Sequence, residues 1–176
     1  YPENVNRLIS IDGMGPPPSM LEERLNQPMA NRLDSWIQDL RKLSSRAVRK
    51  YESLEEAFQR MQTENPHLSE EQARHLTIHG SNQNEDGTFS WKFDNYVRAF
   101  PPTGIPFEDQ WTMFSRITCP TLLVRGLESW ASDPTKDGRI ENFKTRVEVE
   151  AFADAGHWVH HDQLEPFVEK AKSFLM

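Results

Sequence analysis

Three short segments with the composition of β-strands are spaced very unevenly along this chain of 176 residues. The first covers residues 5–11, and the second, residues 121–124, follows only after a long, mainly helical stretch with one short alternating segment at residues 88–93. The segment 121–124 is apolar on both faces, as in a parallel strand that is covered on both sides. The third segment, residues 147–152, alternates apolar and polar side chains and indicates a half-exposed edge strand. We therefore predict an α/β fold with three parallel strands.

The stretch between the first two strands has the signals of helices. Apolar side chains recur at intervals of three and four residues between positions 29 and 43, which indicates an amphipathic helix. Residues 53–56 and 69–72 have the Ser-x-x-Glu and Ser-x-x-Gln spacing of capping boxes, with which helices begin. Insertions of this size at the carboxyl end of a parallel strand commonly serve as lids. The sequence thus predicts a helical cap inserted into the sheet-forming part.

Proline and glycine residues mark the boundaries of these parts. We assign residues 1–18 to a core strand and linker, residues 19–107 to the helical cap or lid, and residues 108–176 to the C-terminal core. The last part contains the second and third strands and a closing helix at residues 166–175. It also carries the candidate catalytic histidine and the two first-ranked candidate acids.

The composition restricts the classes of partner. The formal net charge of -7 argues against a nucleic-acid partner, which needs a basic face. The single cysteine, Cys119, allows no internal disulfide and is expected to be a buried thiol. No apolar segment approaches the roughly 20 residues of a membrane span. We expect a cytoplasmic protein with a small-molecule substrate and no nucleic-acid or membrane partner.

A histidine follows the third predicted strand in the segment Asp154-Ala155-Gly156-His157-Trp158. Gly156 permits a sharp turn that directs the imidazole away from the strand. A strand that ends in an acid, followed by a strand that ends in a histidine, is typical of the last two members of a nucleophile-His-acid triad. We predict His157 as a catalytic residue. No Gly-x-Ser-x-Gly segment occurs in the chain, so we expect the nucleophile to lie outside it.

Other histidines do not form a pattern for metal binding. His160 and His161 follow His157 too closely to share its direction, and no acid or cysteine stands at a ligand-like spacing. His75 and His79 lie four apart on a predicted helix without a third ligand, which indicates a solvated helix face. We expect neither a metal nor a cofactor.

These segments, in their order and spacing, resemble the C-terminal portion of an α/β-hydrolase. Residues 1–12 are similar to the family's sixth strand and its approach, and residues 19–107 to its helical cap. Residues 119–126 (Cys-Pro-Thr-Leu-Leu-Val-Arg-Gly) are similar to its seventh strand, and residues 155–158 (Ala-Gly-His-Trp) to the loop with the triad histidine.

The resemblance implies an esterase-like hydrolase that acts on a small to medium apolar ester or a related acyl substrate, without a metal. It also implies that the nucleophile and the first five strands belong to the missing N-terminal half of the same enzyme, which is then a partner of this chain.

The acid of the triad is open among three carboxylates. Many relatives carry aspartate three residues after the glycine that closes the seventh strand, but this chain has Ser129 there. We rank Glu128 first and Asp133 second because both lie near that position and either carboxylate can orient an imidazole. Asp12, at the end of the first strand, ranks third because an Asp-Gly pair is typical of a turn.

Two alternatives remain beside the esterase-like hydrolase. The scaffold can serve as a non-catalytic binding or interaction module, in which case the upstream sequence lacks a nucleophile. A nucleophilic aspartate in the missing half would instead make the enzyme a dehalogenase or an epoxide hydrolase.

Overall fold

A computed structural model describes residues 1–176, apart from the side chain of Arg98. The chain forms two units. The first contains Tyr1–Gln27 and Gly104–Met176, and the second contains Pro28–Thr103. The cap predicted from the sequence, residues 19–107, extends beyond the second unit at both ends, because helix α1 (Pro18–Asn26) and residues 104–107 belong to the first unit.

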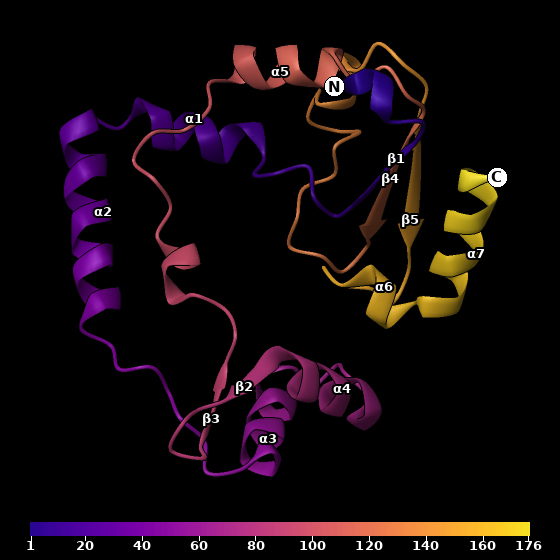
Figure 1. Cartoon of the computed structure of the whole chain (residues 1–176). Helices are drawn as coiled ribbons and strands as arrows, with labels where there is room; N and C mark the ends of the chain where they lie inside the picture. The colour runs from indigo at the N-terminus through magenta and orange to yellow at the C-terminus, as the bar shows by residue number, and fades with distance from the viewer. The chain divides into compact units, whose positions relative to one another are not determined.

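The first unit contains a parallel sheet of three strands, β1 (Leu8–Ile11), β4 (Thr121–Gly126) and β5 (Val147–Phe152), in the order β1-β4-β5 (Figure 1). Every residue of β4 except Arg125 is buried, as the run at residues 121–124 predicts for a central strand. The pattern of β5 is mostly half-buried, and β5 is an edge of the described sheet. The predicted α/β fold with three parallel strands is confirmed.

One face of this sheet packs against the two last helices, α6 (Val159–Asp162) and α7 (Leu164–Leu175). Leu122 and Val124 on β4 form a core cluster with side chains from both helices, among them Val159 and Phe174. Figure 1 shows α6 beyond the carboxyl ends of the strands and α7 running back beside β5. The sheet therefore ends next to the segment between β5 and α6.

The remaining elements of the first unit are short. They are η1 (Pro2–Asn4), α5 (Phe107–Ser115) and η3 (Ile140–Asn142), besides α1. Phe114 of α5 stacks on Phe143 directly after η3, with ring centroids 5.2 Å apart, and joins these two elements. Cys119 is buried before β4, as expected for an inert thiol.

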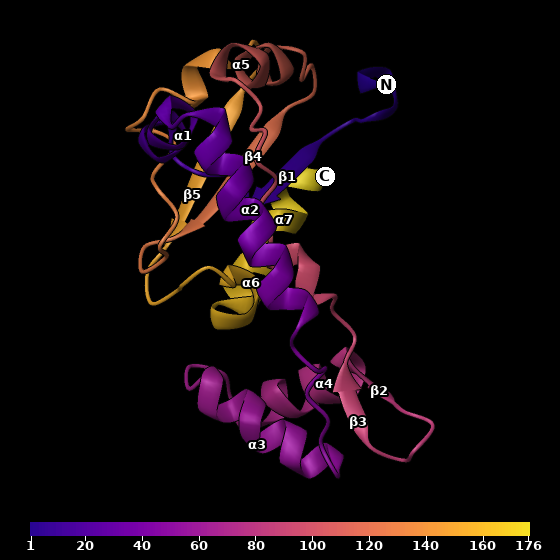
Figure 2. The same cartoon turned by 90° about the vertical axis from the view of Figure 1, so that its left-hand side faces the viewer.

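The second unit is mainly helical. It contains α2 (Met29–Ser44), α3 (Leu54–Glu64), α4 (Glu70–Gly80), the strands β2 (Ser81–Gln83) and β3 (Phe89–Trp91), and η2 (Asn95–Arg98). Figure 2 shows α3 and α4 side by side next to the hairpin of β2 and β3. The helices α2, α3 and α4 agree with the helix signals of the sequence.

The two predicted capping boxes differ in outcome. At α4 the box is complete: the Ser69 hydroxyl accepts a hydrogen bond from the backbone of Gln72, whose side chain accepts one from the backbone of Ser69. At α3 the hydroxyl of Ser53 accepts from the backbone of Glu56, but the Glu56 carboxylate binds the backbone N–H of Glu52. Both arrangements occupy donors that a helix start leaves without partners.

Among the described residues no helix is both long and apolar enough to span a membrane.

Candidate functional site

His157 lies in hydrogen-bond contact with a buried carboxylate at the carboxyl end of the sheet. Its Nδ1 is 2.6 Å from Oδ2 of Asp12, and the two residues are 145 positions apart in the chain. The side chain of Asp12 is 3% exposed, whereas that of His157 is 39% exposed. A carboxylate only accepts hydrogen bonds, so this contact places the proton of the neutral imidazole on Nδ1. Nε2, with its lone pair, is then the nitrogen that can accept a proton.

The end of β1 directs Asp12 into this position. Its backbone N–H donates to the carbonyl of Val124 at 2.7 Å and extends the ladder between β1 and β4 by one residue. Its φ of 48° is in the left-handed region, which aspartate enters more readily than most residues but still at a cost. The chain thus turns sharply at Asp12, and the carboxylate contacts Ser129, which follows β4, and His157, which follows β5.

The loop of His157 is held to the end of β4 and to helix α6. The backbone N–H of Glu128 donates to the carbonyl of Ala155 at 3.0 Å. The carboxylate of Asp162 accepts the backbone N–H of Gly156 at 2.8 Å. Asp154 takes a left-handed φ of 52° at the start of this loop. These contacts fix the backbone on which the imidazole is mounted.

Gly126 is required where β4 meets this loop. A Cβ added there would overlap the carbonyl oxygens of both Ala155 and Gly156. Gly126→Ala is therefore expected to displace the histidine loop and to lower the free energy of unfolding by about 1–3 kcal/mol. Urea denaturation of the protein expressed from its complete coding sequence measures this change.

The matched control is Gly80→Ala at the end of α4. A Cβ there meets only the ring of Trp91 at 3.7 Å, an ordinary van der Waals distance. We expect this substitution to be neutral or to stabilise by up to about 1 kcal/mol, because alanine is the better helix former. Equal losses of stability at the two positions would contradict the close approach at Gly126.

Ser129 completes the surroundings of the carboxylate. Its hydroxyl donates to Oδ2 of Asp12, the same oxygen that faces His157. The hydroxyl oxygen accepts the backbone N–H of Ala131 at 3.1 Å, which leaves its proton for Asp12. Ser129 therefore occupies the position three residues after Gly126 where many relatives carry aspartate. Its hydroxyl binds Asp12, the acid at the end of β1.

The structure brings the third-ranked of the three candidate acids, and neither of the other two, into contact with His157. Glu128, ranked first, is exposed, and no hydrogen bond or ion pair joins its side chain to His157 among the described residues. Asp133, ranked second, is 3.0 Å from Arg125 and binds the hydroxyl and backbone N–H of Thr135. The third candidate, Asp12, is the carboxylate that meets the imidazole, because the left-handed turn after β1 brings it there.

The environment of Asp133 is that of a structural carboxylate. Its burial alone would raise its pKa, but the hydrogen bonds from Thr135 and the charge of Arg125 lower the pKa below its ordinary value. The ionised carboxylate of Asp133 therefore binds Arg125 and Thr135 and serves the local structure.

An aromatic side chain lies against the catalytic candidate. The ring of Trp130 is 4.9 Å from the ring of His157 between centroids, at an angle of 37°. Trp130 is itself 75% exposed, so one of its faces remains open. The partly exposed imidazole of His157 thus stands beside an apolar surface.

Four other histidines contact each other in pairs. His160 packs against His161 and Phe167 within the pair of helices α6 and α7. His75 and His79 stack on each other along α4 in the second unit. No group of three His, Cys, Asp or Glu side chains among the described residues could hold a metal ion.

Comparison with known proteins gives a consistent fold. No family model matches the sequence. The sn-1-specific diacylglycerol lipase ABHD11 of Mus musculus is 26% identical over 97 residues, which cover 51% of this chain and 28% of that protein. An esterase of M. tuberculosis superposes with a TM-score of 0.73 at 21% identity, covering 99% of this chain. The thioesterase domain from the curacin biosynthetic pathway superposes with a TM-score of 0.75 at 21% identity, covering 98%.

The chain spans little more than half of these structures, 56% of the esterase and 59% of the thioesterase domain. The parallel order of β1, β4 and β5, the helical unit inserted after β1 and the superpositions agree with one another. The chain has the α/β-hydrolase fold.

Proposed function

We propose that this chain carries the base and the acid of an esterase-like hydrolase, with His157 as the base and Asp12 as the acid. The nucleophile, a serine in this proposal, lies outside residues 1–176, in the N-terminal half of the same enzyme. The observation that carries the proposal is the pair of His157 and the buried Asp12 at 2.6 Å, at the carboxyl ends of parallel strands.

The chemistry follows from the two ring nitrogens. The oxygen of the nucleophilic serine attacks the ester carbonyl, and Nε2 of His157 accepts the serine's proton. The ester carbon becomes tetrahedral. Asp12 holds Nδ1–H and stabilises the imidazolium that forms. The imidazolium then protonates the departing alcohol, which leaves an acyl-enzyme. Water attacks the acyl-enzyme through the same base and releases the acid.

A non-catalytic module is the weaker interpretation. A binding scaffold has no use for a buried carboxylate in a left-handed conformation that faces a half-exposed imidazole, since both features cost stability. Such strained and buried ionisable groups concentrate at catalytic sites. An aspartate nucleophile would use the same His157 and Asp12, so it differs only in the residue outside the chain.

Two observations support an apolar acyl substrate. Trp130 offers an open apolar face next to the reacting nitrogen. The similar proteins include an esterase, a thioesterase domain and a diacylglycerol lipase, all named for acyl substrates.

The test is hydrolysis of p-nitrophenyl esters by the protein expressed from its complete coding sequence. Each CH₂ that an apolar pocket buries contributes about 0.8 kcal/mol, so kcat/KM is expected to rise on the order of tenfold from acetate to butyrate. Hydrolysis no faster than the buffer background would contradict the proposal. Turnover of epoxides or haloalkanes in place of esters would identify the aspartate-nucleophile chemistry instead.

A further inference from the structure

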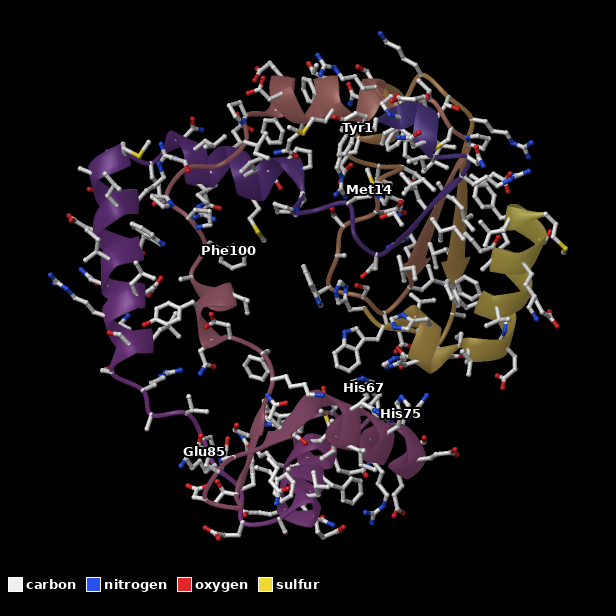
Figure 3. The ribbon with its side chains drawn as sticks, in the orientation of Figure 1. Tyr1, Met14, His67, His75, Glu85 and Phe100 are labelled. Atoms are coloured by element: carbon white, nitrogen blue, oxygen red, sulfur yellow. The ribbon has the colours of Figure 1, made fainter. Side chains whose placement is uncertain are left out.

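The loop that carries Asp12 has few polar anchors of its own. After the hydrogen bond of Asp12 to Val124, no backbone hydrogen bond joins residues 13–16 to the rest of the described chain. Gly15 takes a left-handed φ of 76° within this loop. Met14, labelled in Figure 3, lies where the loop runs beside the segment that follows β4. Something outside the loop must therefore hold it.

Arg139 supplies this anchor. Its Nη1 donates to the carbonyl of Met14 at 3.2 Å and to that of Gly15 at 3.0 Å. Its Nη2 donates to the carbonyl and the hydroxyl of Ser132, at 3.1 and 2.6 Å. The guanidinium has five N–H donors in a rigid fork, and here both ends of the fork are used. One side chain thus joins the loop after β1 to the segment after β4.

The charge of Arg139 is buried and paired. The residue is 3% exposed, and Asp137 accepts from its Nε at 2.9 Å and lies 2.7 Å from its Nη2. Burial would raise the pKa of Asp137, but the hydrogen bond from Arg139 lowers the pKa below its ordinary value. A buried ion pair is often no more stabilising than apolar side chains of the same size. The buried ion pair of Arg139 therefore indicates a role in positioning the two loops rather than in stabilising the fold.

The same segment also holds the carboxylate itself, through the hydroxyl of Ser129 on Oδ2 of Asp12. The space between the two loops is small, with a cavity of about 10 Å³ lined by Asp12, Gly13, Ala131 and Arg139 among others. A shift of the loop after β1 therefore moves Asp12 relative to both Ser129 and His157.

We propose that Arg139 is a positioning residue, which holds the loop of Asp12 against the segment of Ser129 and so keeps Oδ2 of Asp12 within reach of His157. Arg139 acts through Asp12 and does not touch the substrate. The inference rests on the proposed function for its kinetic consequence, but the contact between Asp12 and His157 can be observed without any substrate.

The test compares Arg139→Met, Arg139→Lys and the double variant Arg139→Met/Asp137→Asn, all in the protein expressed from its complete coding sequence. A misplacement of about 1 Å can cost on the order of 100-fold in rate, so Arg139→Met is expected to lower kcat by about 10- to 100-fold with little change in KM. Arg139→Lys keeps the charge but not the fork of N–H donors, so its kcat should lie between those of the wild-type protein and Arg139→Met. The double variant leaves no uncompensated buried charge, so it should regain thermal stability but not kcat.

Arg125→Met is the matched control. Arg125 also forms an ion pair with the segment after β4, at 3.0 Å from Asp133, but no hydrogen bond joins it to the loop after β1 in the described structure. Its loss should leave kcat within about threefold.

The second readout is the downfield proton resonance of the His157 Nδ1–H, in protein labelled with ¹⁵N-histidine. We expect it to weaken or vanish in Arg139→Met and in the double variant and to persist in Arg125→Met. If kcat of the double variant returns together with its stability, or if the resonance survives in every Arg139 variant, the positioning role is wrong. If the wild-type protein hydrolyses no ester while the resonance follows Arg139, the proposed function fails and the positioning role stands.

Discussion

Replacing His157 with alanine is expected to lower kcat of the complete enzyme by a factor on the order of 10³ or more. The imidazole accepts the nucleophile's proton and returns it to the leaving group, and no other described side chain takes its place beside Asp12. The ring is partly exposed at 39%, so its removal leaves no large cavity and the thermal midpoint should change little. Initial rates and a thermal melt of the same preparation measure the two quantities.

The control for this variant is His160→Ala, in the helix that directly follows. The ring of His160 contacts His161 and Phe167, and no hydrogen bond joins it to Asp12 in the described structure. Its loss should lower kcat by less than about tenfold. If both histidine variants keep most of the activity, His157 is not the base.

Asp12→Asn is expected to lower kcat by about 10³- to 10⁴-fold, at most as much as the corresponding substitution lowers it in a serine protease triad. The asparagine keeps the size of the side chain but can present N–H to the imidazole, which favours the wrong tautomer of His157. The buried position of Asp12, 3% exposed, leaves no water to replace the lost carboxylate. Initial rates of the variant and the wild-type protein on the same ester measure the loss.

Two other acid variants make this prediction specific. Glu128→Gln changes an exposed side chain, and Asp133→Asn changes the partner of Arg125, so each should leave kcat of the folded protein within about threefold. Asp133→Asn should still reduce stability, because it removes one side of a half-buried ion pair. A crippling effect of Glu128→Gln together with a mild effect of Asp12→Asn would restore the ranking made from the sequence.

Local sequence patterns identify β4 and His157, but they do not identify the acid that contacts His157. The all-apolar run at residues 121–124 specified a buried central strand, and β4 is that strand, since burial on both faces leaves a local signature. His157 could be selected for the same reason, because its glycine and its place after a strand are local features. The partner acid is decided by contacts across 145 and 117 positions, to His157 and Ser129, which no local pattern encodes.

Two of the short elements, α6 and β2, also left no signal in the sequence. The helix α6 has four residues and the strand β2 has three, too few to show a period. The Asp-Gly pair at residues 12 and 13 predicted a turn, and a turn is present. The Asp-Gly pair could not indicate that the carboxylate of Asp12, whose backbone is left-handed, meets His157. Arg139 gave no signal either, since its role depends on two loops that meet only in the folded chain.

Our central claim is that His157 and Asp12 activate a serine that lies outside residues 1–176. Labelling of the complete protein with a fluorophosphonate, followed by peptide mass spectrometry, tests this claim most directly. We expect one adduct, on a serine outside residues 1–176, formed at least about 100-fold more slowly in His157→Ala and Asp12→Asn but at the normal rate in Glu128→Gln. An adduct on a residue of this chain, or labelling that survives Asp12→Asn undiminished, would contradict the proposal.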